Sequence, residues 1–413
     1  MVSGEQLVAI DIGSSKIKAV IGEWDDQKKL RILWVGVSES RGIRKGNILD
    51  MEEFKNNLDT ALGDAERMTG DQVSHICLGV SGIHISITRK SGIVAVAGMD
   101  VTEDDVNRSL DMSQNGVDLM NRTILKVIPE SFSLDLESGI KNPVGMSGKK
   151  LEVRSHIISI GANTLSNIKK WVHDVGVEIM DTYPNIIACG EAMLSRRQKE
   201  LGVVAVDIGS SATNIAVYEE GALIYAWVIP IGGEHVTSDL ALGLRISIDT
   251  AERLKLEYGD LNFGEGMKPD YDEEIDLTKL SSVDTITVSR KFMNDIIRAR
   301  YEEIFHCIAM ELKQVGRDGM LPEGAVLTGG AAKMRGLADL ARDYLRLPAC
   351  IGVANEVDGV SGTSLSDPIY TSVIGTLLLA QKYGTAKKPF KINLSVGNLF
   401  RSLKNLFKKI IPS

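Results

Sequence analysis

The chain has 413 residues, 44% of them hydrophobic and 25% charged, with a formal net charge of −8. This is an ordinary globular composition, and the length suffices for two or three domains with well-filled cores. Residues 384–413 carry seven basic and no acidic side chains, so residues 1–383 carry 40 basic against 55 acidic ones, a net charge of −15. An acidic body argues against nucleic acid as a partner.

The four cysteines and six histidines are scattered without metal-ligand spacing, and we expect them to be structural. The first residues do not resemble a signal peptide, and no apolar run reaches the ~18 residues of a membrane-spanning helix. The sequence therefore predicts a cytoplasmic protein.

The N-terminal region is predicted to form a β-meander, a helix and a further strand. Residues 16–24 and 30–40 alternate between apolar and polar side chains on either side of a polar turn. Residues 50–70 have helical apolar spacing, and residues 75–82 form an apolar run typical of a buried strand.

Two segments look inserted into this order. Residues 85–162 combine strand patterns with a helical middle rich in aspartate and asparagine, as in a small α+β module. Residues 243–299 contain the acidic stretch DYDEEIDL, which is more typical of a solvated loop than of a site.

One stretch occurs twice. LVAIDIGSSKIKAVIGE at residues 7–23 returns as VVAVDIGSSATNIAVYE at residues 203–219, with Asp11 and Asp207 in equivalent places. The second copy continues with a third strand, and later segments are predicted to be helices at 234–258, 288–316 and 334–345, with a buried strand at 324–330. Two such halves predict a bilobed α/β protein with a cleft between its lobes.

Each copy contains a Gly-Ser-Ser turn between two strands. Such a turn points backbone N–H groups and hydroxyls at one spot and is typical of phosphate-binding nests. An aspartate directly before the turn needs a cation between itself and phosphate, so Asp11 and Asp207 predict Mg²⁺, bound through water. Two copies in equivalent halves can hold one triphosphate from opposite sides.

Four further pairs of residues are predicted to lie beside the nucleotide. Glycines after a buried strand or before a helix let backbone approach a ligand closely, and charges on one face can reach it together. These pairs are Lys16 with Lys18, Gly232 with Gly233, Glu252 with Lys255, and Gly329 with Gly330.

The motifs at residues 7–19, 203–217 and 326–337 resemble those of the superfamily that contains actin, sugar kinases and heat-shock chaperones. More narrowly, the chain is similar to the FtsA family of bacterial cell-division proteins over essentially its whole length. The segments that carry this narrower resemblance are SRGIRKGNILD (40–50), NPVGMSGKKLEVRSHII (142–158), IPIGGEHVTSDLA (229–241) and AERLKLEYG (251–259).

The resemblance implies an actin-like (ribonuclease H-like) bilobed α/β fold, with duplicated β-meander and helix halves around a nucleotide cleft. On that basis we divide the chain into two lobes with one insert each, a linker and a C-terminal amphipathic helix. The residues are 1–84, 163–200 and 357–383 for the first lobe, 85–162 for its insert, 201–242 and 300–356 for the second lobe, 243–299 for its insert, 384–395 for the linker and 396–413 for the helix.

The resemblance also implies that the ligand is ATP with Mg²⁺. Glu252 and Lys255 would contact the ribose and adenine, and Gly329, Gly330 and Met334 would line the adenosine pocket. The expected nucleotide-binding residues are Asp11, Gly13, Ser14, Ser15, Lys16, Lys18, Asp207, Gly209, Ser210, Ser211, Thr213, Gly232, Gly233, Glu252, Lys255, Gly329, Gly330 and Met334.

Three positions depart from the superfamily pattern. Asn214 stands where a different polar group near the attacking water is usual, and Ala331 stands where a third glycine is common. The helix before the second copy offers no clear equivalent of the glutamate or glutamine that orients this water in hydrolytic relatives, and Asn185 is nearest. An amide cannot take a proton as a carboxylate does, and general-base help is worth about 10²–10⁴-fold. With Asn185 and Asn214 as the only candidates for a catalytic role, we expect slow or negligible ATP hydrolysis and ATP as a structural ligand.

Residues 396–411, VGNLFRSLKNLFKKII, form a cationic amphipathic helix when they are projected at 100° per residue. Apolar side chains gather on one side and basic ones on the other, which is typical of a helix in the interface of an anionic membrane. We therefore expect a peripheral protein on the cytoplasmic side of the cell membrane. The expected membrane contacts are Leu399, Phe400, Arg401, Leu403, Lys404, Leu406, Phe407, Lys408, Ile410 and Ile411.

The resemblance implies that the protein forms filaments at the division site and binds other division proteins. It also implies that the protein anchors the tubulin-like protein FtsZ by binding the C-terminal peptide of FtsZ. In the family this peptide docks on the second insert, although a solvated helix face explains the same charges here. The candidate peptide-binding residues are Lys291, Asn294, Arg298 and Arg300.

Two alternatives stay open. A pilus-assembly ATPase homologue of the PilM type would share the body and the insert, although that family lacks a cationic tail. A small-molecule kinase of the superfamily would need a catalytic aspartate in the cleft, for which the sequence offers no convincing candidate.

Overall fold

A computed structural model of the chain describes residues 6–384, except for residues 26, 28, 41–42, 45–46, 49, 70–72, 264–272, 282–283, 285, 356 and 358–364. The predicted C-terminal helix and all of the predicted linker except Gly384 lie outside the described residues. None of the helices in the described part of the chain is long and apolar enough to cross a membrane.

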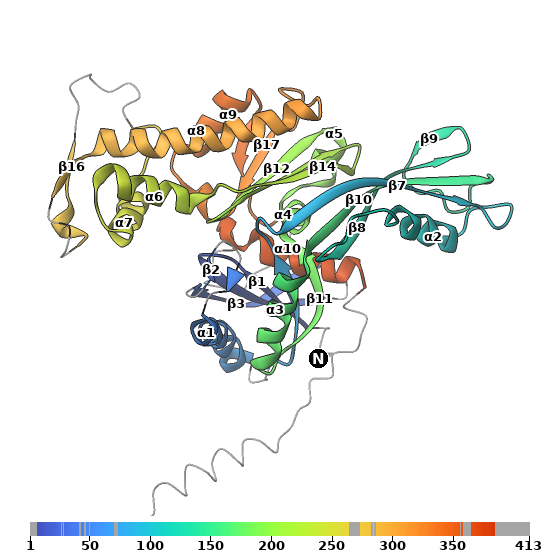
Figure 1. The fold of residues 1–413 in the computed structure, drawn as a ribbon, viewed down its shortest axis with the longest axis horizontal. Coiled ribbons are helices and arrows are strands. Elements are labelled where there is room, and N and C mark those ends of the chain that lie inside the picture. Colours follow the sequence, from blue (N-terminus) through green and yellow to red (C-terminus); the bar gives the residue numbers. More distant parts are fainter. Residues whose placement is uncertain are drawn as a thin grey trace, which may run out of the picture.

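The two lobes are built on five-stranded mixed sheets with the same strand order (Figure 1). The strands of the first sheet are, in spatial order, β11 (Glu178–Pro184), β6 (His75–Val80), β1 (Gln6–Ile12), β2 (Lys16–Trp24) and β3 (Leu30–Glu39). Those of the second sheet are, in the same order, β18 (Ala349–Ile351), β17 (Ala325–Thr328), β12 (Val203–Ile208), β13 (Thr213–Glu219) and β14 (Ala222–Ile229).

Strand direction repeats as well as strand order. In each sheet the first three strands along the chain form an antiparallel meander, and the other two strands join it in parallel on the side of β1 or β12. Val203 and Ala205 of β12 face the core of the first lobe, whereas Val204 and Val206 face the core of the second. A strand covered on both faces needs an unbroken apolar run, which explains the sequences LVAI and VVAV.

Two helices, α4 (Asn185–Met193) and α10 (Thr371–Lys382), lie between the sheets and belong to the core of the first lobe (Figure 1). They pack backbone to backbone, because a Cβ added at Gly375 would lie 1.9 Å from the carbonyl oxygen of Ala188. Both helices place their first turn at the cleft, so that Asn185 and Ser372 line it.

The first insert forms a sheet of its own, which projects from one end of the molecule (Figure 1). The helix α2 (Glu103–Ser113) packs on this sheet above Gly92, where a Cβ would lie 2.0 Å from the carbonyl oxygen of Ser109. The strands are, in spatial order, β7 (Ile85–Ala95), β10 (Lys150–Gly161), β8 (Arg122–Leu134) and β9 (Glu137–Ile140).

The helices of the second lobe differ in detail from the sequence prediction. The helix predicted at 234–258 is two helices, because Arg245 adopts a left-handed conformation (φ 58°) and Ser247 caps the next helix. The last predicted helix starts later than expected, after Gly336 (φ 78°). The helices are α6 (Gly233–Leu244), α7 (Ile248–Tyr258), α8 (Arg290–Gln314), which spans the 299/300 boundary of our division, and α9 (Leu337–Leu345).

The remaining described elements are short or peripheral. They are the helices α1 (Met51–Thr69), α3 (Ala162–Asp174) and α5 (Arg196–Leu201), the two-stranded ribbons β4 (Ile43–Arg44) with β5 (Asn47–Ile48) and β15 (Glu274–Asp276) with β16 (Thr287–Ser289), and the 3₁₀ turns η1 (Leu277–Lys279), η2 (Gly330–Lys333) and η3 (Pro368–Tyr370).

Candidate nucleotide-binding site

A cavity of about 660 Å³ lies between the lobes, lined by both Gly-Ser-Ser turns, by the first turns of α4 and α10 and by η2. It brings together every predicted nucleotide-binding residue except Thr213 and Gly232. Thr213 is buried, and its hydroxyl donates to the carbonyl oxygen of Ile231 over 2.8 Å. Gly232 lies behind the second turn, since a Cβ there would lie 2.6 Å from the carbonyl oxygen of Gly209.

The two turns have the same backbone hydrogen bond. The N–H of Gly13 donates to the carbonyl oxygen of Lys16 over 3.1 Å, and the equivalent N–H of Gly209 donates to that of Ala212 over 2.9 Å. The hydroxyl oxygens of Ser14 and Ser211 lie 2.9 Å apart, so the two turns converge on one spot from opposite lobes.

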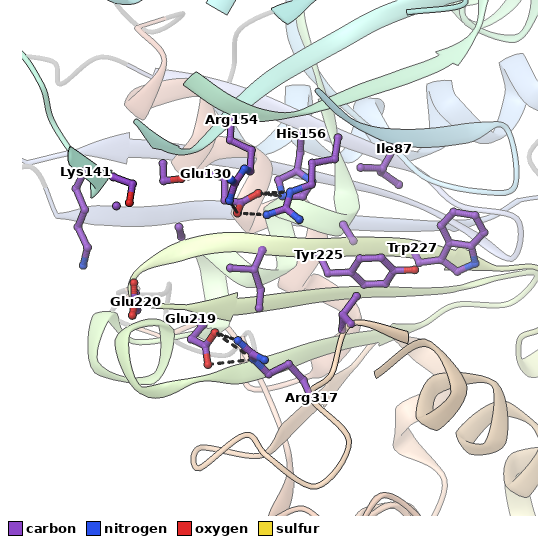
Figure 2. Close-up of a pocket in the computed structure, with 18 of the residues that line it drawn as sticks. Ile87, Glu130, Lys141, Arg154, His156, Glu219, Glu220, Tyr225, Trp227 and Arg317 are labelled. Atoms are coloured by element: carbon purple, nitrogen blue, oxygen red, sulfur yellow. Dashed lines mark hydrogen bonds and ion pairs between the residues drawn. The ribbon is translucent and has the colours of Figure 1, made fainter. Parts of the chain in front are cut away.

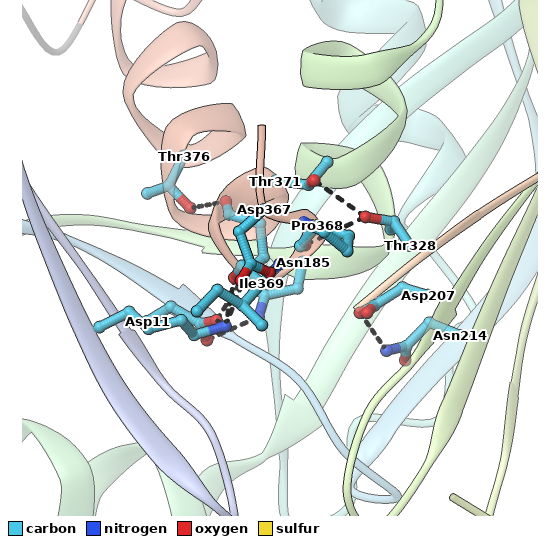
Figure 3. Close-up of polar contacts among 12 residues, drawn as sticks. Asp11, Asn185, Asp207, Asn214, Thr328, Asp367, Pro368, Ile369, Thr371 and Thr376 are labelled. Carbon is cyan, nitrogen blue, oxygen red and sulfur yellow. Dashed lines mark hydrogen bonds and ion pairs between the residues drawn. The ribbon is translucent and has the colours of Figure 1, made fainter. Parts of the chain in front are cut away.

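Asp11 is buried and fully partnered (Figure 3). Lys18 lies 2.5 Å from its Oδ2, Ser372 donates to Oδ2 over 2.6 Å, and the amide of Asn185 donates to Oδ1 over 2.7 Å. Burial by itself would raise the pKa of Asp11, but Lys18 and the hydrogen bonds outweigh it, and the pKa lies below its usual value. Asp11 is therefore an ion-paired carboxylate.

Asp207 has a different environment although it occupies the equivalent position. Its Oδ2 accepts a hydrogen bond of 3.0 Å from the amide of Asn214. Burial raises the pKa of Asp207, the charge of Lys18 opposes this, and the charge of Asp11 adds to it, so that the pKa lies above its usual value. A cation in the cavity would relieve this penalty.

The donors in the cavity fit hydrated Mg²⁺. Asn185 and Asn214 each leave the side-chain oxygen buried and without a hydrogen-bond partner, next to Asp11 and Asp207 respectively. Magnesium ions usually keep several waters and bind through one or two carboxylates together with substrate phosphates. Among the described residues no group of three His, Cys, Asp or Glu side chains could hold a metal. Two carboxylates and two free amide oxygens are suitable acceptors for the waters of such an ion.

Two glycines make room for these side chains. A Cβ at Gly329, whose φ of +91° also disfavours other residues, would lie 2.4 Å from Oδ1 of Asp207. A Cβ at Gly79 would lie 2.6 Å from Oδ1 of Asn185.

The predicted adenosine end is organised around Lys255, which is buried. Its ammonium lies 2.6 Å from Glu252 and donates to the hydroxyl of Thr237 over 2.8 Å and to the carbonyl oxygen of Gly233 over 3.2 Å. The hydroxyl of Tyr301 donates to the carbonyl oxygen of Ala331 over 2.9 Å and holds η2 beside the cavity. These contacts fix the two sides of a pocket that Met334 also lines.

Sequence reasoning missed several cavity residues. Ser372 and Ile369 line the cavity, and no motif marks their segment, which lies 361 positions from Asp11 along the chain. Ser81 and Gly82 also line it. They follow β6, which is topologically equivalent to the strand before Gly329, so the repeat could have indicated them.

A second cavity, of about 850 Å³, separates the first insert from β14 and the end of α8 (Figure 2). Glu130 is central to its insert wall and contacts Arg89, with Nε 2.7 Å from Oε2, and His156, with Nε2 3.3 Å from Oε2. Burial would raise the pKa of Glu130, but these neighbours outweigh it and lower the pKa to about 2. Glu219 and Arg317 form an ion pair on the other wall.

The four candidate peptide-binding residues lie on α8 in different environments. Lys291 is exposed. Asn294 is buried and accepts a hydrogen bond of 2.8 Å from the backbone N–H of Asp260. Arg298 donates to the carbonyl oxygen of Leu261 over 3.0 Å, and Arg300 makes two hydrogen bonds, of 2.6 and 2.9 Å, to Asp239.

Comparisons with known proteins bear on both fold and family. A family model described as cell division protein FtsA matches residues 204–375, and one described as the SHS2 domain inserted in FtsA matches residues 82–159. The chain is 35% identical to the cell division protein FtsA of Bacillus subtilis over 382 residues, 92% of this chain and 84% of that one. It is 32% identical to that of Pseudomonas aeruginosa over 397 residues (95% and 93%) and 30% identical to that of Escherichia coli K12 over 413 residues (98% and 97%).

Solved structures share the fold at low identity. A chain of the PilM–PilN type IV pilus biogenesis complex matches with a TM-score of 0.64 at 15% identity, over 90% of this chain and 98% of that one. MreB5 of Spiroplasma citri bound to ADP matches with a TM-score of 0.54 at 13% identity, over 93% and 99%. These likenesses confirm the predicted actin-like bilobed α/β fold. The relatives at 30–35% identity over nearly the whole chain show more than the fold, and the chain belongs to the FtsA family of bacterial cell-division proteins.

Proposed function

We propose that this chain binds Mg-ATP between its two Gly-Ser-Ser turns as a structural ligand that holds the lobes together. The observation that carries the proposal is the convergence of the turns, with Ser14 and Ser211 in contact, the buried Asp11 behind one and the half-buried Asp207 behind the other. Nests of backbone N–H groups facing each other suit a chain of phosphates. The MreB5 structures, which are bound to ADP and to AMPPNP, support a nucleotide in a fold of this kind.

Calorimetric titration of ATP with and without Mg²⁺ tests this proposal. Ser14→Asp places a negative charge where the phosphates would lie, so we expect it to abolish binding. The matched control, Ser138→Asp, makes the same change on the exposed strand β9 and should bind as the parent does. A parent chain that binds no nucleotide, or a Ser14→Asp variant that binds it normally, would contradict the proposal.

We propose further that hydrolysis is slow or absent. The side chains that hydrogen-bond to Asp11 and Asp207 in the places expected for a group that activates water are the amides of Asn185 and Asn214, and an amide is not a general base. Turnover by the purified chain should stay below about 1 s⁻¹, the lower end of typical enzyme rates. Faster turnover that co-purifies with the chain would contradict this.

The proposed cellular role follows from the family. The chain would polymerise on the inner membrane face, bind that membrane through residues 396–413 and anchor FtsZ at the division site, together with other division proteins. Flotation with anionic liposomes, with and without residues 396–413, tests the membrane step, and equal binding by both forms would exclude it. Electron microscopy with ATP on an anionic lipid monolayer tests for filaments.

The peptide of FtsZ would bind near the start of α8. Lys291 is exposed there, whereas Asn294 would act by holding the backbone at Asp260. Lys291→Glu should weaken binding of the acidic peptide in a pull-down, and Lys313→Glu, at the far end of the same helix, is the matched control.

A further inference from the structure

Lys18 lies at the edge of the proposed phosphate site, but its ammonium is already saturated. An ammonium has three N–H donors. Nζ lies 2.5 Å from Oδ2 of Asp11, 3.0 Å from the carbonyl oxygen of Ile369 and 3.1 Å from the hydroxyl oxygen of Ser372. Its side chain is 14% exposed and lines the cavity. A phosphate can therefore take a hydrogen bond from Lys18 only if one of the three acceptors gives it up.

The acceptors most easily given up belong to one segment. Hydrogen bonds between charged partners are roughly twice as strong as those to neutral ones, so the bond to Asp11 should persist. The neutral acceptors, Ile369 and Ser372, lie in η3 and at the start of α10. Phosphate binding would thus detach Lys18 from the N-terminal end of α10.

The helix α10 is positioned as a rigid element. It is buried from Thr371 to Thr376 and packs backbone to backbone on α4 at Gly375. Its 12 residues span about 18 Å. The hydroxyl of Thr371 lies 2.8 Å from that of Thr328 in the second lobe, so this end of the helix also touches both lobes (Figure 3).

The other end of α10 meets the joint between the first insert and the first lobe. Tyr383 stacks on Tyr183 of β11, with ring centroids 6.3 Å apart and an interplanar angle of 23°. Lys126 of the insert strand β8 lies 4.3 Å from the ring of Tyr183 and 5.3 Å from that of Tyr383, and pairs with Asp181 over 2.8 Å. One cation therefore ties the insert, the first lobe and the end of α10 together.

We propose that this joint regulates nucleotide affinity through α10. The joint holds α10 where Ile369 and Ser372 can bind Lys18, and so favours the unliganded arrangement. Loosening the joint makes Lys18 easier to release and tightens ATP binding, and ATP in turn loosens the joint, since coupling between two sites is reciprocal. A partner that moves the insert would thereby change the nucleotide affinity. This inference rests on the proposed nucleotide site.

The test is the dissociation constant of ATP with Mg²⁺, measured by calorimetry on the full chain. Tyr383→Ala should lower it about fivefold, the lower end of typical coupling between sites. Tyr383→Phe keeps the ring and should match the parent. Lys126→Met keeps the apolar stem but loses the charge, so it should change the constant in the same direction. Tyr344→Ala is the matched control, because Tyr344 is similarly exposed (38% against 44%) but lies on α9 of the second lobe.

Hydrogen exchange measures the reciprocal effect, that of ATP on the joint. Exchange of the variants without ATP also shows whether they are folded. Addition of ATP to the parent should speed exchange at least twofold in peptides containing residues 178–184 and Tyr383. If the parent binds ATP and neither Tyr383→Ala nor Lys126→Met changes the dissociation constant, this inference alone is overturned. An equal effect of Tyr344→Ala would overturn it as well. A parent that binds no ATP would overturn the proposed nucleotide site as well.

Discussion

Lys18 and Asn214 occupy the same register position in the two hairpins, Lys18 opposite Asp11 and Asn214 opposite Asp207. Each contacts the aspartate that it faces, but only Lys18 brings a charge. The duplicated hairpins therefore hold one neutralised carboxylate and one whose burial is not compensated by an ion pair of its own. The charge of Lys18, together with the hydrogen bonds from Ser372 and Asn185, lowers the pKa of Asp11, whereas burial and the charge of Asp11 raise the pKa of Asp207.

The same amide substitution should have opposite effects on stability in the two hairpins. Asp11→Asn leaves Lys18 buried without its counter-charge and should lower the free energy of unfolding by about 3–5 kcal/mol, the usual cost of breaking a buried pair. Asp207→Asn removes a buried charge that burial disfavours and should raise it. Denaturant unfolding without nucleotide measures both, and each variant is the control for the other. Equal destabilisation by the two changes would contradict the asymmetry.

Asp207 should also make stability and ligand binding respond to pH in opposite ways. Its pKa in the folded chain lies above the value of 3.8 expected when unfolded, so the folded state binds more protons. The free energy of unfolding of the parent should therefore fall below that of Asp207→Asn as the pH rises through the raised pKa. The difference should vanish below pH 3.8. Mg-ATP binding should instead strengthen over that window, because the ionised carboxylate attracts the cation.

The Mg²⁺ dependence of ATP binding separates these two roles. Asp207→Asn should lose about 10- to 100-fold in affinity for Mg-ATP, the usual effect of removing a group that orients metal ligands. Its affinity should hardly change with pH over the same range. A parent-like affinity for Mg-ATP in Asp207→Asn would show that the carboxylate does not face the ion.

Much of the site could be predicted because the repeat marks it. Two copies of the same turn in equivalent halves had to meet if the halves pack symmetrically, and the hydroxyls of Ser14 and Ser211 are in contact. The sequence could not show that the ammonium of Lys18 donates to Ile369 and Ser372 as well as contacting Asp11. Ile369 and Ser372 lie more than 350 positions away from Lys18 along the chain. Nor could spacing on a helix tell that Asn294 is buried, since the residues that cover it come from another part of the chain.

Local backbone choices also escaped the sequence patterns. The helix predicted at 234–258 keeps its apolar spacing across Arg245, but the chain turns there in a left-handed conformation that few residues other than glycine adopt. The cap at Ser247 then starts a helix in a new direction and brings Lys255 to the cavity. The membrane helix at 396–413 stays a prediction.

Glu252 should matter both for the nucleoside and for the fold. Its side chain is 43% exposed, lines the cavity and pairs with Lys255. Glu252→Gln keeps the shape and removes the charge, so it should weaken ATP binding about tenfold, the lower end of what one hydrogen bond to a charged group contributes. Thermal unfolding should also move to a lower temperature, because Lys255 is buried and loses its counter-charge. Glu257→Gln, on the exposed face of the same helix, is the matched control.

Glu130 should stabilise the chain at neutral pH but not in acid. Its side chain is only 8% exposed and lies among Arg89, Arg154 and His156 (Figure 2). Glu130→Gln leaves Arg89 and Arg154 without their carboxylate and should cost about 1–3 kcal/mol in the free energy of unfolding. Because the pKa falls from 4.5 to about 2 on folding, this contribution is complete above pH 4.5 and is lost as the pH falls toward 2.

The matched control for Glu130 is Glu152→Gln on the neighbouring strand β10. Glu152 is 34% exposed and lies 3.9 Å from Lys150, a surface pair of the kind worth at most about 1 kcal/mol. Chemical unfolding of the two variants at pH 7 and pH 3 separates burial from simple charge. The difference between them should be larger at pH 7 than at pH 3, because the pKa of Glu130 is lowered to about 2 and its contribution falls below pH 4.5. A difference that stays constant with pH would mean that Glu130 acts through its packing and not through its charge.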